Sequence, residues 1–578
     1  MSSGNEVPQG SLSEVLPRLI ERYVPITRWL PQYDRSGLRH DLVGALTSWG
    51  VMVPVALAYA GLAGVPPELG LVTAFIALAA YAVFGTSRHL KVTVSSTMAI
   101  MSASVVAGLV PSSPAEYVAL TSALALVVGL ILVAAGVARL GFISDFLAKS
   151  VITGFIFGLA ITIIVGQLPK ILGVPGLSGS LPQQVVQLVG QLPDTNPYTL
   201  AVGLGSLIII LVLRRISRRI PGPLIVLVLG IAGAAALGLE QYGVSLVGDV
   251  ATGIPLPSLP GVPLTTIPFL VVGAAGIVFL AVGESVGTAR AYAARNGYEI
   301  EPDQELIALG AANLGSGLFG GFTTDASLSQ TATAASAGVV TQLSSLVTSG
   351  LVLATAIVLA PLFRTLPQAV LGAIVIAAVL SLMDVKELRR YWAWRRTDFL
   401  IAMAAMVGVL LTTVLVGMML AVLLSVGFVL YRASRPHVAV VGRMPGQRAG
   451  YGDLTRHPEA ERIPGLVMVR LDAPLYFFNA NVARAQILDL VAAAQPPPHG
   501  VLIDLAATAD LDVTTADMLL ALVRDLRARS IEVLLAQVKG PVRDRMSKTP
   551  LMAEIGQDRI YLSVGSGVND FQRRWPAA

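Results

Sequence analysis

The chain has 578 residues, of which 54% are hydrophobic and only 13% are charged, and its formal net charge is +5. Since soluble proteins carry about 25% charged residues, this composition excludes an ordinary soluble protein. Cysteine is absent, which excludes disulfides and thiolate metal sites, and the scattered histidines predict no metal site and no cofactor. A basic balance is typical of the cytoplasmic loops of membrane proteins, so we expect no nucleic-acid partner.

Residues 1–40 lack a continuous apolar stretch and are rich in arginine. They therefore predict a cytoplasmic N-terminal segment and not a cleaved signal peptide.

Residues 41–433 contain apolar runs of about 17–25 residues, the length that a membrane helix needs. In the first half we predict spans at 41–60, 67–86, 94–109, 115–138, 145–168, 198–213 and 222–239. In the second half they follow at 266–293, 303–320, 325–338, 340–363, 367–383, 397–414 and 416–432. Seven spans in each repeat (about 41–240 and about 265–433) place the second copy upside down in the membrane. The sequence thus predicts a polytopic α-helical membrane protein with 14 spans arranged as a 7+7 inverted repeat.

Basic residues indicate the orientation of these spans. If the N-terminus is cytoplasmic, the inside loops hold basic groups such as Arg88 with Lys91 and the run from Lys386 to Arg396, whereas the outside loops hold little beyond Lys170 and Arg364. This distribution follows the positive-inside rule. We expect both termini to be cytoplasmic and the protein to lie in the plasma or inner membrane, surrounded by lipid.

Two short spans rich in Ser and Thr, 94–109 and 325–338, occupy corresponding positions in the two halves. Paired discontinuous helices of this kind indicate the binding site of a secondary transporter. The first N–H groups of a helix are unpaired, and its dipole adds about half a positive charge there, so two such ends would bind an anion without a basic side chain. The predicted anion-binding residues are Ser95, Ser96, Thr97, Ala326, Ser327, Leu328 and Gln330. The alternative is that these Ser and Thr residues only hold helices together.

Glu284 is an acid inside an apolar span, where a charge is costly and therefore functional by default. It is predicted to carry a proton or to bind a cation, unless it only makes a structural hydrogen bond. A proton is the simpler choice over sodium, because one further intramembrane acid, Asp325, is near. Asp325 either shares this coupling site or caps the helix that follows, accepting from the N–H of Ser327 or Leu328.

Two motifs bear on nucleotides. The string from Gly315 to Gly320 matches GxGxxG, but it ends an apolar helix instead of following a strand, so we reject dinucleotide binding. There is no GxxxxGK[ST] loop, so ATP does not drive the protein directly. We expect a transporter and not an enzyme.

Residues 434–578 have an ordinary polar composition and alternate between short strands and helices. Strands are predicted from Leu466, Val501 and Val533, and amphipathic helices from Asn481 and Thr514. The segment from Gly446 to Gly465 is predicted as a loop. The tail is therefore expected to be a small cytoplasmic α/β domain.

Several stretches resemble the sulfate permease (SulP) family of anion transporters with its C-terminal STAS domain. They are AYAGLAGVPPELGL from Ala58, FGTSRHL from Phe84, GFTTDASLSQTAT from Gly321, LYFFNAN from Leu475 and VLIDLAATADLDVTTADML from Val501. The resemblance implies a core domain (helices 1–4 and 8–11) that moves against a gate domain (helices 5–7 and 12–14), with the anion between helices 3 and 10. It also implies alternating access for sulfate, bicarbonate or a dicarboxylate, a homodimer, and a cytoplasmic partner of the STAS domain.

The chain departs from the family pattern at several positions: Val55, Thr93-Val94, Thr323, Ala326 and Gln330. Gln330 stands where relatives often have arginine, so a fixed positive charge is missing and a monovalent anion is favoured over a dianion. In the tail, Thr514 occupies the position that related STAS domains phosphorylate, or it serves as a helix N-cap.

Two other functions stay open at this point. One is a nucleobase–proton symporter with the same 7+7 layout, which also uses an acid in its eighth helix but has no STAS domain. The other is a membrane sensor that acts through its STAS domain on a cytoplasmic partner.

Overall fold

The computed structural model describes the chain except for residues 1–22, 143–148, 218–219, 413, 447–449 and 577–578. The chain divides into two compact units, Met1–Ser425 and Val426–Ala578, and each is described by itself. The predicted N-terminal segment lies largely outside the described residues. Its remainder contains α2 (Ile26–Trp29) and a 3-10 turn at Arg35–Gly37.

Helices occupy all fourteen predicted positions, and the seven-plus-seven prediction is confirmed. The first half contains α3 (Leu38–Ala63), α4 (Pro67–Phe84), α5 (Ser96–Ala107), α6 (Pro114–Val137), α7 (Lys149–Leu172), α9 (Pro197–Ile216) and α10 (Gly222–Leu237). The second half contains α11 (Ile267–Asn296), α12 (Pro302–Leu318), α13 (Leu328–Ser336), α14 (Leu343–Ala354), α15 (Gln368–Leu380), α17 (Arg396–Leu411) and α18 (Val414–Ala433). Helix α14 continues through a π-helical turn (Thr355–Leu359) and a 3-10 turn (Ala360–Thr365). Within the described residues, eight helices are long and apolar enough to cross a membrane.

Between the predicted spans, two further helices were not predicted, α8 (Leu181–Gln191) and α16 (Val385–Trp394). Both lie in segments that the sequence assigned to loops, because they are too short and too polar to read as spans. Their ends are nevertheless well capped: Ser180 and Gln183 form a capping box on α8, and Asp384 accepts from the first N–H groups of α16.

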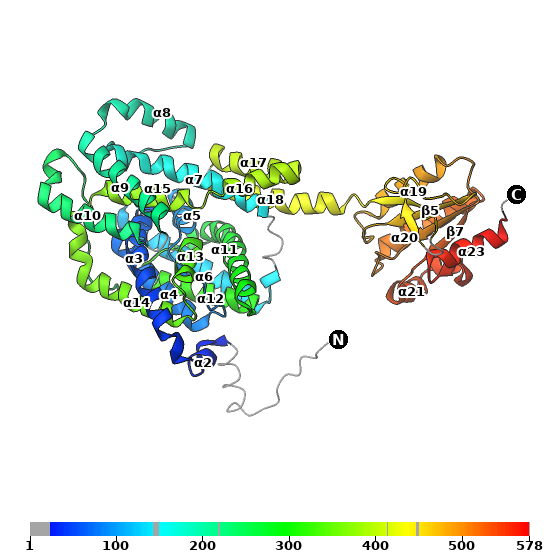
Figure 1. Ribbon diagram of the computed structural model, residues 1–578, viewed down its shortest axis with the longest axis horizontal. Coiled ribbons are helices and arrows are strands. Elements are labelled where there is room, and N and C mark those ends of the chain that lie inside the picture. The colour runs from blue at the N-terminus through cyan, green and yellow to red at the C-terminus, as the bar shows by residue number, and fades with distance from the viewer. Residues whose placement is uncertain (1–22, 143–148, 218–219, 413, 447–449, 577–578) are drawn as a thin grey trace. The chain divides into compact units, whose positions relative to one another are not determined.

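The helices of the first unit pack in two groups (Figure 1). One group contains α3 to α6 and α11 to α14, and the other contains α7, α9, α10, α15 and α17. Helix α3 joins the groups through its contacts with α10 and α15. This division matches the core and gate helices that the family resemblance implies.

Glycines allow the core helices α6 and α12 to pack at close range. A Cβ atom placed on Gly310 would lie 2.8 Å from the carbonyl oxygen of Gly129 and 2.9 Å from the nitrogen of Val133. A Cβ on Gly129 would in turn lie 2.9 Å from the oxygen of Gly310. Since helices in lipid associate through van der Waals packing and close backbone approach, these glycines set the distance between the two halves of the core.

We expect Gly310→Ala to lower the melting temperature of the detergent-solubilised protein, with a cost of about 1–3 kcal/mol for an overpacked contact. The matched control is Gly350→Ala in α14, where an added Cβ meets no atom within 4 Å. Equal melting temperatures for the two variants, measured by size-exclusion chromatography after heating, would contradict the close packing of α6 and α12.

The second unit is built on a six-stranded sheet in the order β4-β3-β5-β6-β7-β8. Its strands are β3 (Val438–Arg443), β4 (Tyr451–Asp453), β5 (Leu466–Leu471), β6 (Gly500–Asp504), β7 (Glu532–Ala536) and β8 (Ile560–Tyr561). The pairs from β5 to β8 are parallel, and β3 is antiparallel to both β4 and β5. The helices are α19 (Ala480–Ala492), α20 (Val513–Ala528), α21 (Gly540–Met546), α22 (Pro550–Ile555) and α23 (Val564–Arg574).

The two sheet faces have separate cores. Apolar residues of α19, α20 and α22 cover one face, and Val564, Val568 and Phe571 of α23 cover the other. The predicted strands β5 to β7 and helices α19 and α20 are confirmed. The segment predicted as a loop contains β4, which was missed because three residues beside glycines carry no readable alternation.

Candidate functional site

The two half-helices are joined by a short antiparallel strand pair. Strand β1 (Val92–Thr93) precedes α5, and β2 (Asp325–Ala326) precedes α13. Val92 pairs with Ala326 and Thr93 with Asp325. The pairing brings corresponding positions of the two repeats together, so the N-termini of α5 and α13 lie close to each other within the core group.

Side chains of neighbouring helices complete the hydrogen bonds of this extended backbone. Asn313 of α12 bonds both the N–H and the carbonyl oxygen of Thr324, each at 2.9 Å. The hydroxyl of Ser285 accepts from the N–H of Ala326 at 3.0 Å. Such support is required, because irregular backbone survives at membrane depth only where protein or a cavity satisfies it.

Lys91, just before β1, fastens the first repeat to the second. Its carbonyl oxygen accepts from the N–H of Ser327, and its own N–H donates to the hydroxyl of Thr331. Its ammonium group donates to Ser344 and Ser345 of α14 at 2.7 and 2.8 Å. Lys91 lies in the segment between α4 and β1 that the sequence assigned to a cytoplasmic loop, but its side chain is only 1% exposed. Hydropathy assigned it to a loop because no short sequence pattern shows the tertiary burial of a single lysine.

The N-cap residues of both half-helices do not use their hydroxyl groups to cap their own helices. Ser95 caps α5 and Ser327 caps α13, and neither side chain bonds an N–H of its own helix. Among the described residues, none accepts from the N–H groups of Ser96, Thr97 and Met98. The ends of the half-helices thus present several donors that their own helices do not use.

A small cavity lies between these ends. It is lined by Tyr59, Ser95, Ser96, Thr97, Glu284, Ser327, Leu328, Ser329, Ala378 and Leu382. Its volume is about 10 Å³, enough for about one water molecule. Most of the lining comes from the core group, whereas Ala378 belongs to α15 of the gate group and Leu382 follows that helix. The cavity therefore lies where the two groups meet.

Five of the seven predicted anion-binding residues line the cavity, and Ala326 and Gln330 do not. Gln330 is fully buried, and neither atom of its amide has a hydrogen-bond partner among the described residues. The roles assigned to both residues stay predictions. The sequence reasoning left out Tyr59, whose hydroxyl lies next to that of Ser96, although Tyr59 stands within the helix stretch that resembles the family. No arginine or lysine is among the described residues that line the cavity.

The two predicted coupling acids are neighbours. Glu284 lines the cavity and is 9% exposed, and Asp325 is fully buried behind it. The carboxyl of Asp325 lies beside that of Glu284 and beside the hydroxyl of Ser95. The alternative that Asp325 caps α13 is wrong, because Ser327 is the N-cap and its N–H donates to the carbonyl of Lys91.

A further buried acid, Glu305 of α12, was not singled out from the sequence. Its carboxylate accepts from the hydroxyl of Tyr81 at 2.6 Å, from the N–H and hydroxyl of Thr86, and from the N–H of Ser87. Its Oε1 atom accepts from the FGTSRHL segment and its Oε2 atom from Tyr81 of α4. Glu305 thus anchors both α4 and the chain that leads to β1.

In the second unit, Thr514 is exposed in the first turn of α20. The N-cap of α20 is Asp512, which accepts from the N–H of Thr515 at 2.8 Å. The capping alternative for Thr514 is therefore wrong, and its phosphorylation stays a prediction.

Taken together, the inverted repeat, the half-helix pair and the appended α/β domain define a helical membrane transporter with a STAS domain. Two family models match the chain: the sulfate permease family over residues 38–405 and the STAS domain over residues 457–567. A probable sulfate transporter of Mycobacterium tuberculosis is 35% identical over 543 residues, which cover 94% of this chain and 97% of the relative. The chain belongs to the sulfate permease family.

Solved structures show the same fold. The murine Solute Carrier 26 family member A9 anion transporter in the inward-facing state has a TM-score of 0.88 at 22% identity, covering 99% of this chain and 97% of the other. The transmembrane domain of a cyanobacterial bicarbonate transporter, BicA, has a TM-score of 0.60 at 24% identity, covering 68% of this chain and 99% of the other.

We expect Asn313→Ala to destabilise the protein, because it leaves the buried N–H and carbonyl of Thr324 without their partner at a cost of about 1–3 kcal/mol. The check is the melting temperature of the detergent-solubilised protein. Asn296→Ala is the matched control, since Asn296 also bonds a carbonyl of its own helix but at an exposed position. If both variants melt together, Asn313 does not support β2.

Proposed function

We propose that the protein is a secondary active transporter of a small anion of the sulfate, bicarbonate or dicarboxylate class. It works by alternating access, is coupled to protons, and binds its anion between the N-termini of α5 and α13. The observation that carries the proposal is the cavity between two uncapped half-helix ends at the meeting of the core and gate groups.

The charge of the site supports an anion. Each half-helix contributes about half a positive charge at its N-terminus, and the hydroxyls of Ser95, Ser96 and Ser327 add hydrogen-bond donors. Together the two helices supply about one positive unit. Since no basic side chain among the described lining residues adds to it, a divalent anion needs a further source of positive charge.

Protons are that source in our proposal. An ionised Glu284 would place a negative charge in the lining and cancel much of the helix contribution. A protonated Glu284 removes this repulsion and donates a hydrogen bond. Anion and proton then favour each other's binding, and by linkage the effect is reciprocal. Asp325, beside Glu284, extends the same proton site.

Alternating access follows from the size of the cavity. A volume of about 10 Å³ is too small for any anion of the proposed class. The anion needs α15 to move away from α5 and α13, which is a displacement of the gate group relative to the core group. The same displacement in opposite senses would open the site to either side of the membrane.

Family membership favours this function over the two alternatives. The STAS match and the sulfate permease match support an anion transporter over a nucleobase symporter. The relative from Mycobacterium tuberculosis is named a probable sulfate transporter, so sulfate is the first anion to test. We further propose a homodimer in the plasma or inner membrane with both termini cytoplasmic, as the basic loops and the family resemblance imply.

The test uses the full-length protein in sealed vesicles, with radiolabelled sulfate, bicarbonate, fumarate and uracil, each with an inward proton gradient, an inward sodium gradient or neither. We expect one of the three anions to enter, faster with the proton gradient, and uracil to be excluded. Entry of uracil alone would establish the nucleobase symporter, and entry of none would leave the sensor as the function.

Glu284→Gln tests the coupling role. We expect this variant to keep anion binding, because a neutral amide preserves the charge of the protonated acid, and to lose the acceleration by the proton gradient. The matched control is Glu299→Gln, the same change at an exposed position after the end of α11. Full gradient-driven uptake by Glu284→Gln would remove Glu284 from the coupling mechanism.

A further inference from the structure

The second unit contains a pocket that the transport function does not use. It lies where the parallel strands β5 to β7 end and α23 begins, and its volume is about 250 Å³. Its lining residues are Val441, Tyr451, Arg470, Asp504, Gln537, Ser563, Val564 and Gly565. Ligands of open parallel sheets bind outside the carboxyl ends of the strands, so the position is suited to a small molecule.

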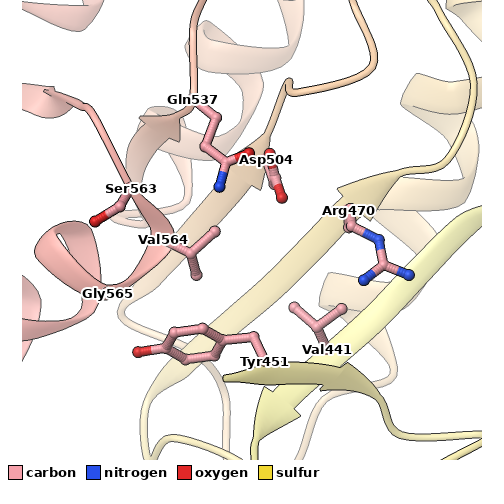
Figure 2. A pocket seen from close by; sticks show the side chains of 8 residues that line it. All are labelled: Val441, Tyr451, Arg470, Asp504, Gln537, Ser563, Val564 and Gly565. Atoms are coloured by element: carbon pink, nitrogen blue, oxygen red, sulfur yellow. The ribbon is translucent and has the colours of Figure 1, made fainter. Parts of the chain in front are cut away.

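One wall of the pocket carries a hydrogen-bond acceptor that has no donor. Asp504, at the end of β6, is only 6% exposed. One of its oxygens accepts from the N–H of Ala506 at 3.0 Å, and the other has no partner among the described residues. Figure 2 shows its side chain and that of Gln537 along one side of the pocket. A buried carboxylate without a cationic partner is costly, and burial accordingly raises the pKa of Asp504.

Arg470 attracts this carboxylate through its charge but makes no direct bond to it. Its Nε donates to Asp472 at 2.6 Å, and no ion pair joins Arg470 to Asp504 in the described structure. The charges of Arg470 and Asp472 cancel, so the ionised Asp504 leaves one negative unit at this wall. A cationic group of a ligand would compensate it.

A second wall, formed by the start of α23, offers hydrogen-bond donors. The side chain of Ser563 accepts from the N–H of Ser566, which leaves the N–H groups of Val564 and Gly565 at the start of α23 without a partner among the described residues. Ser563 lies across the pocket from Arg470 in Figure 2. Free N–H groups and the helix dipole favour a negative group here.

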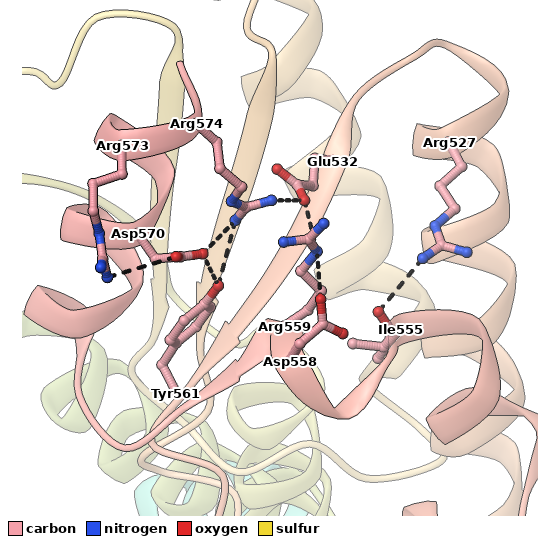
Figure 3. Close-up of polar contacts among 9 residues, drawn as sticks. All are labelled: Arg527, Glu532, Ile555, Asp558, Arg559, Tyr561, Asp570, Arg573 and Arg574. Atoms are coloured by element: carbon pink, nitrogen blue, oxygen red, sulfur yellow. Dashed lines mark hydrogen bonds and ion pairs between the residues drawn. The ribbon is translucent and has the colours of Figure 1, made fainter. Parts of the chain in front are cut away.

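The position of α23 is fixed by polar contacts at its other end (Figure 3). Arg574 bonds Glu532 and Asp570, and the hydroxyl of Tyr561 donates to Asp570 at 2.5 Å. Arg559 also pairs with Glu532 at 2.7 Å. These contacts hold α23 on its face of the sheet, so the wall made by its N-terminus is preorganised.

Between the two walls the lining is apolar. Val441 and Val564 are buried, and the ring of Tyr451 lies below them in Figure 2. We propose that this pocket binds an α-amino acid with an apolar side chain, its ammonium group on Asp504, its carboxylate at the N-terminus of α23 and its side chain against Val441 and Tyr451.

Other ligand classes fit less of the pocket. A simple anion would meet the unpaired carboxylate of Asp504, and a simple amine would leave the N–H groups of Val564 and Gly565 unused. A metal ion lacks ligands, since no group of three or more His, Asp or Glu side chains in the described residues could hold one. Only a molecule with both charges, a short distance apart, satisfies both walls.

The experiment is equilibrium dialysis of tritiated leucine against the purified full-length protein in detergent. Unlabelled leucine and methionine compete, together with isopentylamine, which lacks the carboxylate, and 4-methylpentanoate, which lacks the amine. We expect leucine to bind saturably and methionine to displace it. Each single-charge analogue should compete with an affinity at least tenfold lower. Absence of saturable binding, or equal competition by either analogue, overturns the proposal.

Two variants locate the binding. Asp504→Asn keeps the shape of the side chain but removes its charge, and we expect at least a tenfold loss of leucine affinity; Asp489→Asn, at an exposed position of α19, is its control. Gly565→Leu extends a side chain into the pocket, since an added Cβ there meets only ordinary contacts of 3.8 Å or more, and it should abolish binding. Its control is Gly540→Leu, where a Cβ meets nothing within 4 Å. Leucine binding unaffected by Asp504→Asn and Gly565→Leu overturns the assignment to this pocket.

Discussion

The membrane unit depends on one constraint: every backbone N–H and carbonyl in the bilayer must find a partner inside the protein or line a cavity. The β1–β2 pair meets this constraint where both half-helices begin. Its hydrogen bonds are completed by Asn313, Ser285 and the backbone of Lys91. Because these partners come from both repeats, the hydrogen bonds that support the interrupted helices also join the two repeats.

The interruption has an electrostatic consequence. A continuous helix would hide its N–H groups, but two half-helices expose theirs, and the strand pair brings them together. Since the side chains of Ser95 and Ser327 make no capping hydrogen bond, the first N–H groups of α5 stay free beside the cavity. The acids Glu284 and Asp325 occupy the same place, so positive helix ends and titratable carboxyls act on one small volume. In our proposal, this closeness couples the anion to a proton.

In the second unit, a helix N-terminus also forms part of a pocket. The start of α23 offers free N–H groups, as α5 does, but here a buried carboxylate faces them across an aqueous pocket instead of a membrane cavity. In both units, the proposed function of a helix N-terminus depends on a second polar group that the tertiary structure places near it. The contacts of Arg574 with Glu532 and of Asp570 with Tyr561 join α23 to the sheet.

The sequence by itself determined the fourteen helical segments, the division into repeats and the polar half-helices, because hydrophobic length and Ser/Thr content are local properties of the chain. It also determined the strands β5 to β7, whose apolar runs are buried on both faces. It could not determine the partners of single polar residues. Lys91 and Glu305 are buried and hydrogen-bonded, and Gln330 lies outside the cavity lining. Their neighbouring residues do not distinguish Lys91 from a loop charge, Glu305 from a functional acid, or Gln330 from a residue that binds the anion. Only the tertiary structure decided these roles, because the environment of a side chain is set by residues that lie hundreds of positions away in the sequence.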